Sequence, residues 1–176
     1  EDGLRDADVK TVLLGPHGEL WLGLNNGLAR LGAGRPATYF GAGEGLPGFV
    51  VGLARYAGRL FAATSEGIGV LEPARAPGAT AAFRALPGLV DYCHALLSTE
   101  NGLVAACDHG VHSVTATGYR QLMRVESAYT LHVSRAHPDR LYVGMSDGVA
   151  VMTLRDGRWQ FAGRIAGLRT EVRSLA

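Results

Sequence analysis

Histidines are the side chains of this sequence best suited to bind a metal, and one pair lies beside a carboxylate. His109 and His112 are three residues apart, and Asp108 precedes them. Residues three apart on a β-strand point to opposite faces, and a zinc site normally needs four ligands in a tetrahedral arrangement. We therefore interpret these histidines as turn and surface residues and expect no metal site. The remaining histidines are His17, His94, His132 and His137.

Carboxylates and nucleophiles give no better case for catalysis. Glu66, Asp108 and Asp147 could supply the paired carboxylates of a glycoside hydrolase, but each lies in a turn, where such residues are common for conformational reasons. No G-x-S-x-G motif is present. The glycine-rich stretch 41–48 lacks the Gly-Lys-Ser/Thr ending of a phosphate-binding loop. We predict a protein that is not an enzyme and has no cofactor, with Trp21 and Trp159 as packing aromatics.

The amino-acid composition is typical of a folded chain with a net charge close to zero. Of the 176 residues, 19% are charged and 47% are hydrophobic, and the net charge is +1. These values argue against disorder, and nothing in the charge demands nucleic acid or an anionic membrane. No apolar run approaches the roughly 18 residues of a membrane span, so we expect no membrane insertion by this segment.

Two cysteines, Cys93 and Cys107, are too few for a disulfide scaffold. Cys93 lies in an apolar run and Cys107 at a predicted strand end. This placement favours two buried free thiols, whereas a bridge would require an oxidising compartment.

The chain contains one hairpin four times. Aligning the copies on the glycine of the turn gives steps of 40, 43 and 38 residues, a period typical of repeat architectures. Each turn carries Asn, Asp, Ser or Glu before the glycine, as tight turns prefer. The copies are LWLGLNNGLARL (20–31), LFAATSEGIGVL (60–71), LVAACDHGVHSV (103–114) and LYVGMSDGVAVM (141–152), with the glycines at Gly27, Gly67, Gly110 and Gly148.

Further strands complete each copy. One apolar string precedes each hairpin, and another short strand follows it, so that a unit holds four antiparallel strands in about forty residues, as in a β-propeller blade. No helical period is sustained, and a sandwich or barrel would leave the regular recurrence unexplained. We predict an all-β domain over 1–176, with approximate blades 1–40, 41–86, 87–125 and 126–163 and the first strand of a fifth blade in 164–176.

Four blades and a fifth strand suggest a fragment of a larger propeller, of about seven blades. Such a fragment would leave two blade faces uncovered. We therefore expect a homodimer, or contact with further propeller blades.

One stretch resembles a known repeat. HGELWLGLNNGLARL followed by ATYFGAGEGLPGFVV is similar to the two-component regulator propeller repeat, "dG.lWiGT.nGl.r.d" and then "f..y...dGLp...V". The match is strong in the first blade, whereas Ala62-Ala63-Thr64 replaces the tryptophan strand in the second and Tyr142-Val143-Gly144 partly restores it in the fourth. The resemblance implies the extracytoplasmic sensor of a bacterial membrane receptor, periplasmic or extracellular, whose output is a cytoplasmic histidine kinase or cyclase outside this chain.

Two loops recur in such a blade: the turn after the second strand and the connection into the first strand. Both should lie at the same end of the propeller, and loops clustered on a rigid scaffold commonly carry function. We predict that a small molecule, such as a saccharide, or a protein signal binds there. An architectural propeller that mediates dimerisation without a ligand remains the alternative. The candidate ligand-binding residues are Arg55, Tyr92, His94, Asp108, His109, His132 and Asp147.

Overall fold

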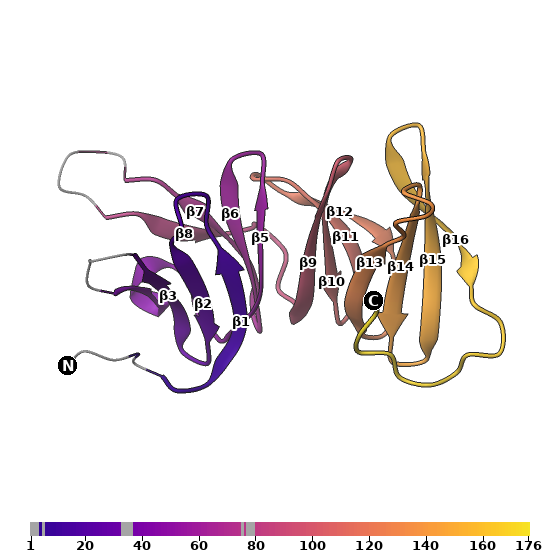
Figure 1. Ribbon diagram of the computed structural model, residues 1–176, viewed down its shortest axis with the longest axis horizontal. Coiled ribbons are helices and arrows are strands. Elements are labelled where there is room, and N and C mark those ends of the chain that lie inside the picture. The colour runs from indigo at the N-terminus through magenta and orange to yellow at the C-terminus, as the bar shows by residue number, and fades with distance from the viewer. Residues whose placement is uncertain (1–3, 5, 33–36, 75, 77–79) are drawn as a thin grey trace.

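The computed structural model describes the chain except residues 1–3, 5, 33–36, 75 and 77–79, and the described part is almost entirely β-structure (Figure 1). Its one helical element is the short 3-10 helix η1 (Ala42–Glu44). The strands are β1 (Val9–Leu14), β2 (Leu20–Leu24), β3 (Gly27–Leu31), β4 (Thr38–Phe40), β5 (Val50–Tyr56), β6 (Arg59–Thr64), β7 (Gly67–Glu72), β8 (Ala82–Ala85), β9 (Cys93–Thr99), β10 (Gly102–Cys107), β11 (Gly110–Val114), β12 (Tyr119–Met123), β13 (Ala128–Val133), β14 (Arg140–Met145), β15 (Gly148–Arg155) and β16 (Arg158–Arg164).

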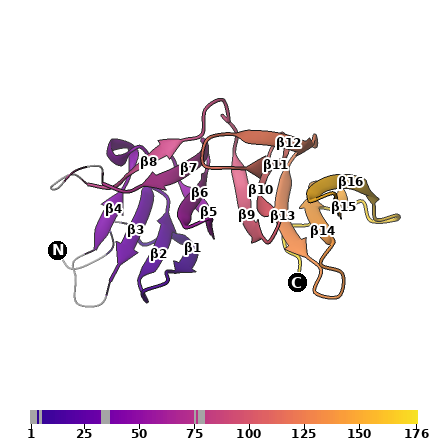
Figure 2. The same cartoon turned by 90° about the horizontal axis from the view of Figure 1, so that it is seen from above.

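These strands form four separate antiparallel sheets of four strands each, and within every sheet neighbouring strands are consecutive in the chain. Figure 2 shows the sheets along an arc, with β1, β5, β9 and β13 toward its middle and β4, β8, β12 and β16 at its periphery. Consecutive first strands lie beside one another. This arrangement is that of β-propeller blades, so the predicted fold class is confirmed.

The second strand of each blade is largely apolar because it packs against a neighbouring blade. Trp21 and Leu60 pack between the first two blades, Phe61 and Leu103 between the second and third, and Val104 and Leu141 between the third and fourth. Trp159 is also buried in the last of these cores. The two tryptophans are packing residues, as predicted.

Glycine at the hairpin turn is required by two constraints. The four turn glycines have φ between 121° and 154°, a range in which side-chain-bearing residues are strained. A Cβ atom on any of them would also lie 2.1–2.5 Å from a backbone carbonyl oxygen of a following segment. The turn chemistry seen in the sequence therefore has a packing cause as well as a conformational one.

Each first strand contains a β-bulge at its second residue. In the pairing between the first and second strands, one residue of the first strand has no partner in every blade. These residues are Lys10, Val51, His94 and Tyr129. A bulge redirects the side chain of the extra residue and increases the local twist. The same device thus recurs at the same place in all four blades.

Residues after β16 form no strand but dock like the start of a blade. A Cβ on Gly144 would meet the carbonyl oxygen and Cγ1 of Val172, as one on Gly23 would meet the same atoms of Val50. Val172 also donates its N–H to the carbonyl of Met145, over 2.9 Å. Val172 therefore corresponds to Val50, and Arg173 corresponds to the bulged residue Val51.

One face of the first blade is apolar and uncovered. Leu13 and Trp21 point toward the second blade. The residues that alternate with them, Val12, Leu14 and Leu20, are 57%, 66% and 38% exposed. No helix in the described residues has the length and apolar character needed to cross a bilayer.

Candidate ligand-binding site

The bulged residues and Arg173 occupy equivalent positions around the middle of the arc, and we call them the axial row: Lys10, Val51, His94, Tyr129 and Arg173. Each is preceded, two residues earlier, by a residue of the connecting segment. In the first blade, the third blade and the segment after β16, these two residues contact each other directly. Lys10 pairs with Asp8, His94 stacks on Tyr92, and Arg173 pairs with Glu171.

Aromatic rings form a continuous line across three blades. Phe49 meets Tyr92 edge-on with centroids 5.5 Å apart, and Tyr92 stacks on His94 at 4.2 Å. His94 meets Tyr129 edge-on at 5.0 Å. Arg173 ends the line, with its guanidinium carbon 4.2 Å from the Tyr129 centroid. All four rings are half-buried, so they combine an apolar surface with access to solvent.

A carboxylate fixes the histidine of this line. Asp108 Oδ1 lies 2.8 Å from His94 Nε2 and accepts a hydrogen bond from Ser127 Oγ over 3.0 Å. Backbone bonds add to this contact, because the Asp108 N–H donates to Tyr92 and the Ser127 N–H donates to Asp108. The turn after a second strand and the connections into two first strands therefore lie at one end of the molecule, as predicted.

A cationic side chain lies at each end of the axial row. The Lys10 ammonium lies 2.7 Å from Asp8 Oδ2, and this hydrogen bond, with the charges of Asp8, Tyr92 and Asp6, raises its pKa. The pKa of Arg173 is raised mainly by its hydrogen bond with Glu171. The charge of Tyr92 contributes in both cases. The aromatic line thus runs between two side chains that remain cationic at neutral pH.

Two further predicted residues lie near this end of the molecule but have other partners. His109 is 82% exposed in its side chain, and its Nδ1 lies 2.9 Å from Asp91 Oδ1. That hydrogen bond chiefly raises the pKa of His109. Asp147 accepts a short hydrogen bond from Arg164 at the outer strand, 2.5 Å long. Neither residue joins the aromatic line.

The last two predicted residues lie toward the opposite end of their strands. Arg55 donates to Glu19 Oε1 over 3.1 Å, beside the ring of Trp21, and so joins the first two blades. His132 lines a different pocket. That pocket also contains Ser134, Arg135, Tyr142, Leu175 and Ala176.

The structure thus brings together Tyr92, His94 and Asp108 of the seven predicted residues. Sequence reasoning missed Phe49, Ser127, Tyr129, Lys10 and Arg173. The repeat period relates the bulged residues, because each lies 35 to 43 residues from the bulged residue of the next blade. The period could have located all of them only if the position of one bulge had been known.

The cysteines differ from expectation. The sequence favoured free thiols at Cys93 and Cys107 and left a bridge open, and the two residues form a disulfide with an S–S distance of 2.07 Å. The two residues face each other across β9 and β10, with Cα atoms 3.9 Å apart. The bulge at His94 creates this pairing, and the spacing of the cysteines in the sequence could not reveal it.

His112 is also unlike its prediction as a turn or surface histidine. It is 4% exposed, because its position on β11 faces the second blade opposite Ala105. Burial lowers its pKa, so the ring is neutral at pH 7. Its partner in the sequence pair, His109, lies in the turn before β11, and its side chain is 82% exposed.

Comparisons with known proteins agree with the fold. No protein-family model matches the chain, and no curated protein matches it. Among solved structures it is similar to the extracellular domains of two proteins from B. thetaiotaomicron designated hybrid two component systems. The first has a TM-score of 0.72 and 14% identity over 98% of this chain and 24% of that one. The second has a TM-score of 0.70 and 18% identity over 94% and 23%.

A third similar structure is designated a 6-phosphogluconolactonase, from Bacteroides uniformis, with a TM-score of 0.60 and 15% identity over 93% of this chain and 59% of that one. The chain spans about a quarter of the length of the two extracellular domains. At these identities the likeness shows the fold alone.

Proposed function

We propose that this chain is part of an extracytoplasmic sensory β-propeller of a bacterial receptor, of the two-component regulator propeller type, and that it binds a small molecule at the axial row. The observation that carries the proposal is the line of half-buried rings from Phe49 to Tyr129, which ends at the Arg173 guanidinium. The extracellular domains of similar fold support the cellular context. A cytoplasmic kinase or cyclase outside these residues would be the output.

The chemistry of the row fits a saccharide. The C–H faces of a sugar ring pack on aromatic rings, while its hydroxyls need donors and acceptors close by. Both kinds of group are present, because Tyr92 stacks on His94 and the His94 Nε2 lies 2.8 Å from Asp108 Oδ1. Binding sites for small molecules are commonly built in this way, from aromatic walls with a few fixed polar groups.

Sensing, rather than catalysis, fits the described residues. Asp108 already holds His94 and Ser127, and Asp147 holds Arg164. The two carboxylates thus already have different partners. We propose a non-enzymatic domain in which ligand binding shifts the balance between two arrangements of the blades.

A thermal-shift screen of neutral and acidic saccharides tests the proposal. A ligand that binds only the folded chain at 100 times its dissociation constant stabilises it by about 2.7 kcal/mol. We expect Tyr129→Ala and His94→Ala to abolish the shift. Tyr142→Ala, in the pocket at the other end, should retain it. No shift with any saccharide, or a shift that both axial variants retain, would contradict saccharide binding at this row.

A further inference from the structure

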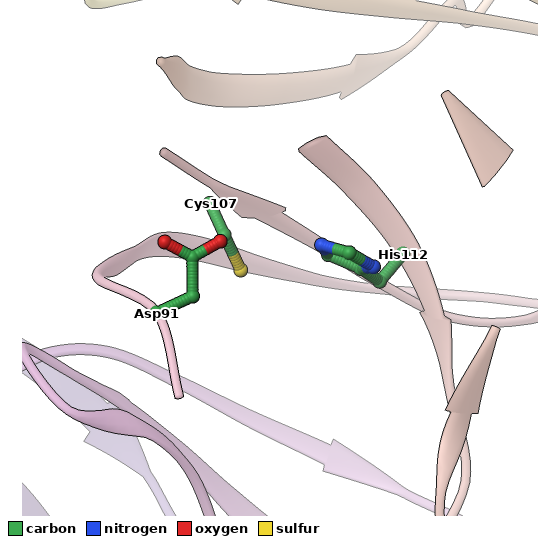
Figure 3. Close-up of side chains that lie close together, drawn as sticks. All are labelled: Asp91, Cys107 and His112. Atoms are coloured by element: carbon green, nitrogen blue, oxygen red, sulfur yellow. The ribbon is translucent and has the colours of Figure 1, made fainter. Parts of the chain in front are cut away.

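A second group of side chains lies between the second and third blades, partly on residues next in the chain to Tyr92, His94 and Asp108. Asp91, Cys107 and His112 place one carboxylate oxygen, one sulfur and one ring nitrogen within 4.8 Å of one another. Figure 3 shows the Asp91 carboxylate beside the Cys107 sulfur, with a ring nitrogen of His112 directed toward them. Cys93 is bonded to Cys107, and its sulfur lies beside this group of three, outside the 4.8 Å limit.

The state of His112 is an independent indication of a ligand. The side chain is buried, and neither ring nitrogen has a hydrogen-bond partner among the described residues. A buried polar group without a partner costs on the order of 1–3 kcal/mol, and such groups call for a functional explanation. Its nearest ring neighbour, Tyr119, contacts it edge-on and donates its hydroxyl elsewhere, to Gly88.

The four proposed donors, which are of three types, match zinc. Thiolate, imidazole and carboxylate are the usual ligands of Zn²⁺, and structural sites take four of them. Asp91 is also held in place, because the N–H and Nδ1 of His109 lie 3.0 and 2.9 Å from its two oxygens. Contacts of this kind orient the ligands of metal sites.

We propose that Asp91, Cys93, Cys107 and His112 bind Zn²⁺ when the Cys93–Cys107 disulfide is reduced. A dithiol reductant transfers two electrons and two protons to the cysteine sulfurs. The S–S bond breaks, and the reductant closes into its own disulfide. Zn²⁺ then displaces one proton from each thiol, leaving two thiolates, one imidazole nitrogen and one carboxylate oxygen as ligands. The oxidised form lacks both thiolates and binds zinc weakly, so the site responds to redox conditions.

The test compares the oxidised and dithiol-reduced chain, with the reductant removed under anaerobic conditions, in zinc titrations against a chromophoric chelator. We expect one zinc ion per reduced chain, at least about 100-fold tighter than in the oxidised form. His112→Ala should weaken zinc binding by the reduced chain by about tenfold or more. His137→Ala, in the exposed β13–β14 turn, should leave it unchanged.

Equal zinc affinity in the two redox forms would overturn the proposal, and so would unchanged affinity in His112→Ala. If His112→Ala does not fold, the reduced wild-type chain still decides. Bound Co²⁺ should give thiolate-to-metal charge-transfer bands with a tetrahedral ligand-field spectrum, and zinc-edge X-ray absorption should give two sulfur and two nitrogen or oxygen neighbours. A zinc environment without sulfur, or with sulfur alone, would refute the assignment.

Discussion

At the residue scale, Glu19 shows how a single carboxylate can fix a neighbouring blade. Its side chain is 6% exposed and accepts hydrogen bonds from the His17 N–H, Trp21 Nε1 and Arg55. The pKa of Glu19 is lowered, chiefly by its own backbone amide, then by Trp21 and His17 and by the charge of Arg55, against a desolvation effect that raises it. This contact, rather than ligand binding, accounts for the position of Arg55.

Replacing Glu19 with Gln should therefore destabilise the fold in a pH-dependent way. A carboxyl group whose pKa is lower in the folded state stabilises that state above the unfolded pKa, about 4.3, and this contribution is lost as the pH falls through the folded value. The difference in unfolding free energy between wild type and E19Q should be present at pH 7 and shrink in acid, measured by urea denaturation. E100Q, at an exposed turn, is the control and should show no such trend. A pH-independent difference would contradict this account.

At the element scale, the turn glycine and the β-bulge both recur in every blade, but only the glycine can be recognised from the sequence. The glycine is visible in the sequence, because φ near 130° at Gly67 and Gly148 excludes most other residues. The bulge is not, because residues as different as Lys10, Val51, His94 and Tyr129 occupy it. Backbone pairing alone defines that position, and the side chain is free to vary with function.

The turn glycine should be intolerant of substitution. At Gly67 an added Cβ would meet the Leu89 carbonyl oxygen at 2.3 Å, and the backbone conformation adds strain of roughly 1–3 kcal/mol. We expect Gly67→Ala to destabilise the fold. Each kcal/mol of unfolding free energy that is lost should lower the melting temperature by about 2–4 °C. Gly118→Ala has nothing within 4 Å of the new Cβ, and it should be neutral or slightly stabilising. Equal melting temperatures for the two variants would show that the packing argument is wrong.

At the scale of the whole molecule, the uncovered face of the first blade remains to be explained. Val12, Leu14 and Leu20 lie together on it, because Leu14 pairs with Leu20 across β1 and β2. The other blade interfaces bury such residues in apolar clusters. The sequence predicted either a homodimer or contact with further propeller blades, and we propose the first, in which a second copy of the chain covers this face.

Sedimentation velocity tests the dimer. The wild-type chain should sediment as a dimer at micromolar concentration, and Leu14→Asp should convert it to a monomer, because a charge in an apolar interface is costly. Val90→Asp places the same charge at an apolar side chain that is 88% exposed in another part of the chain, and it should leave the dimer intact. A monomeric wild type, or a Leu14→Asp dimer of unchanged affinity, would contradict a self-association role for this face.

By itself, the sequence determined the blades. The hairpin period, the turn glycines and the apolar second strands follow from local rules of turn conformation and alternation, which a linear pattern records directly. Tertiary structure decided the sites. The bulges that place His94 and Tyr129 in one line, the register that opposes Cys93 to Cys107, and the blade packing that buries His112 all depend on pairing between strands. The pairing register between strands decides which side chains from different strands meet. The spacing of residues along the chain does not specify that register.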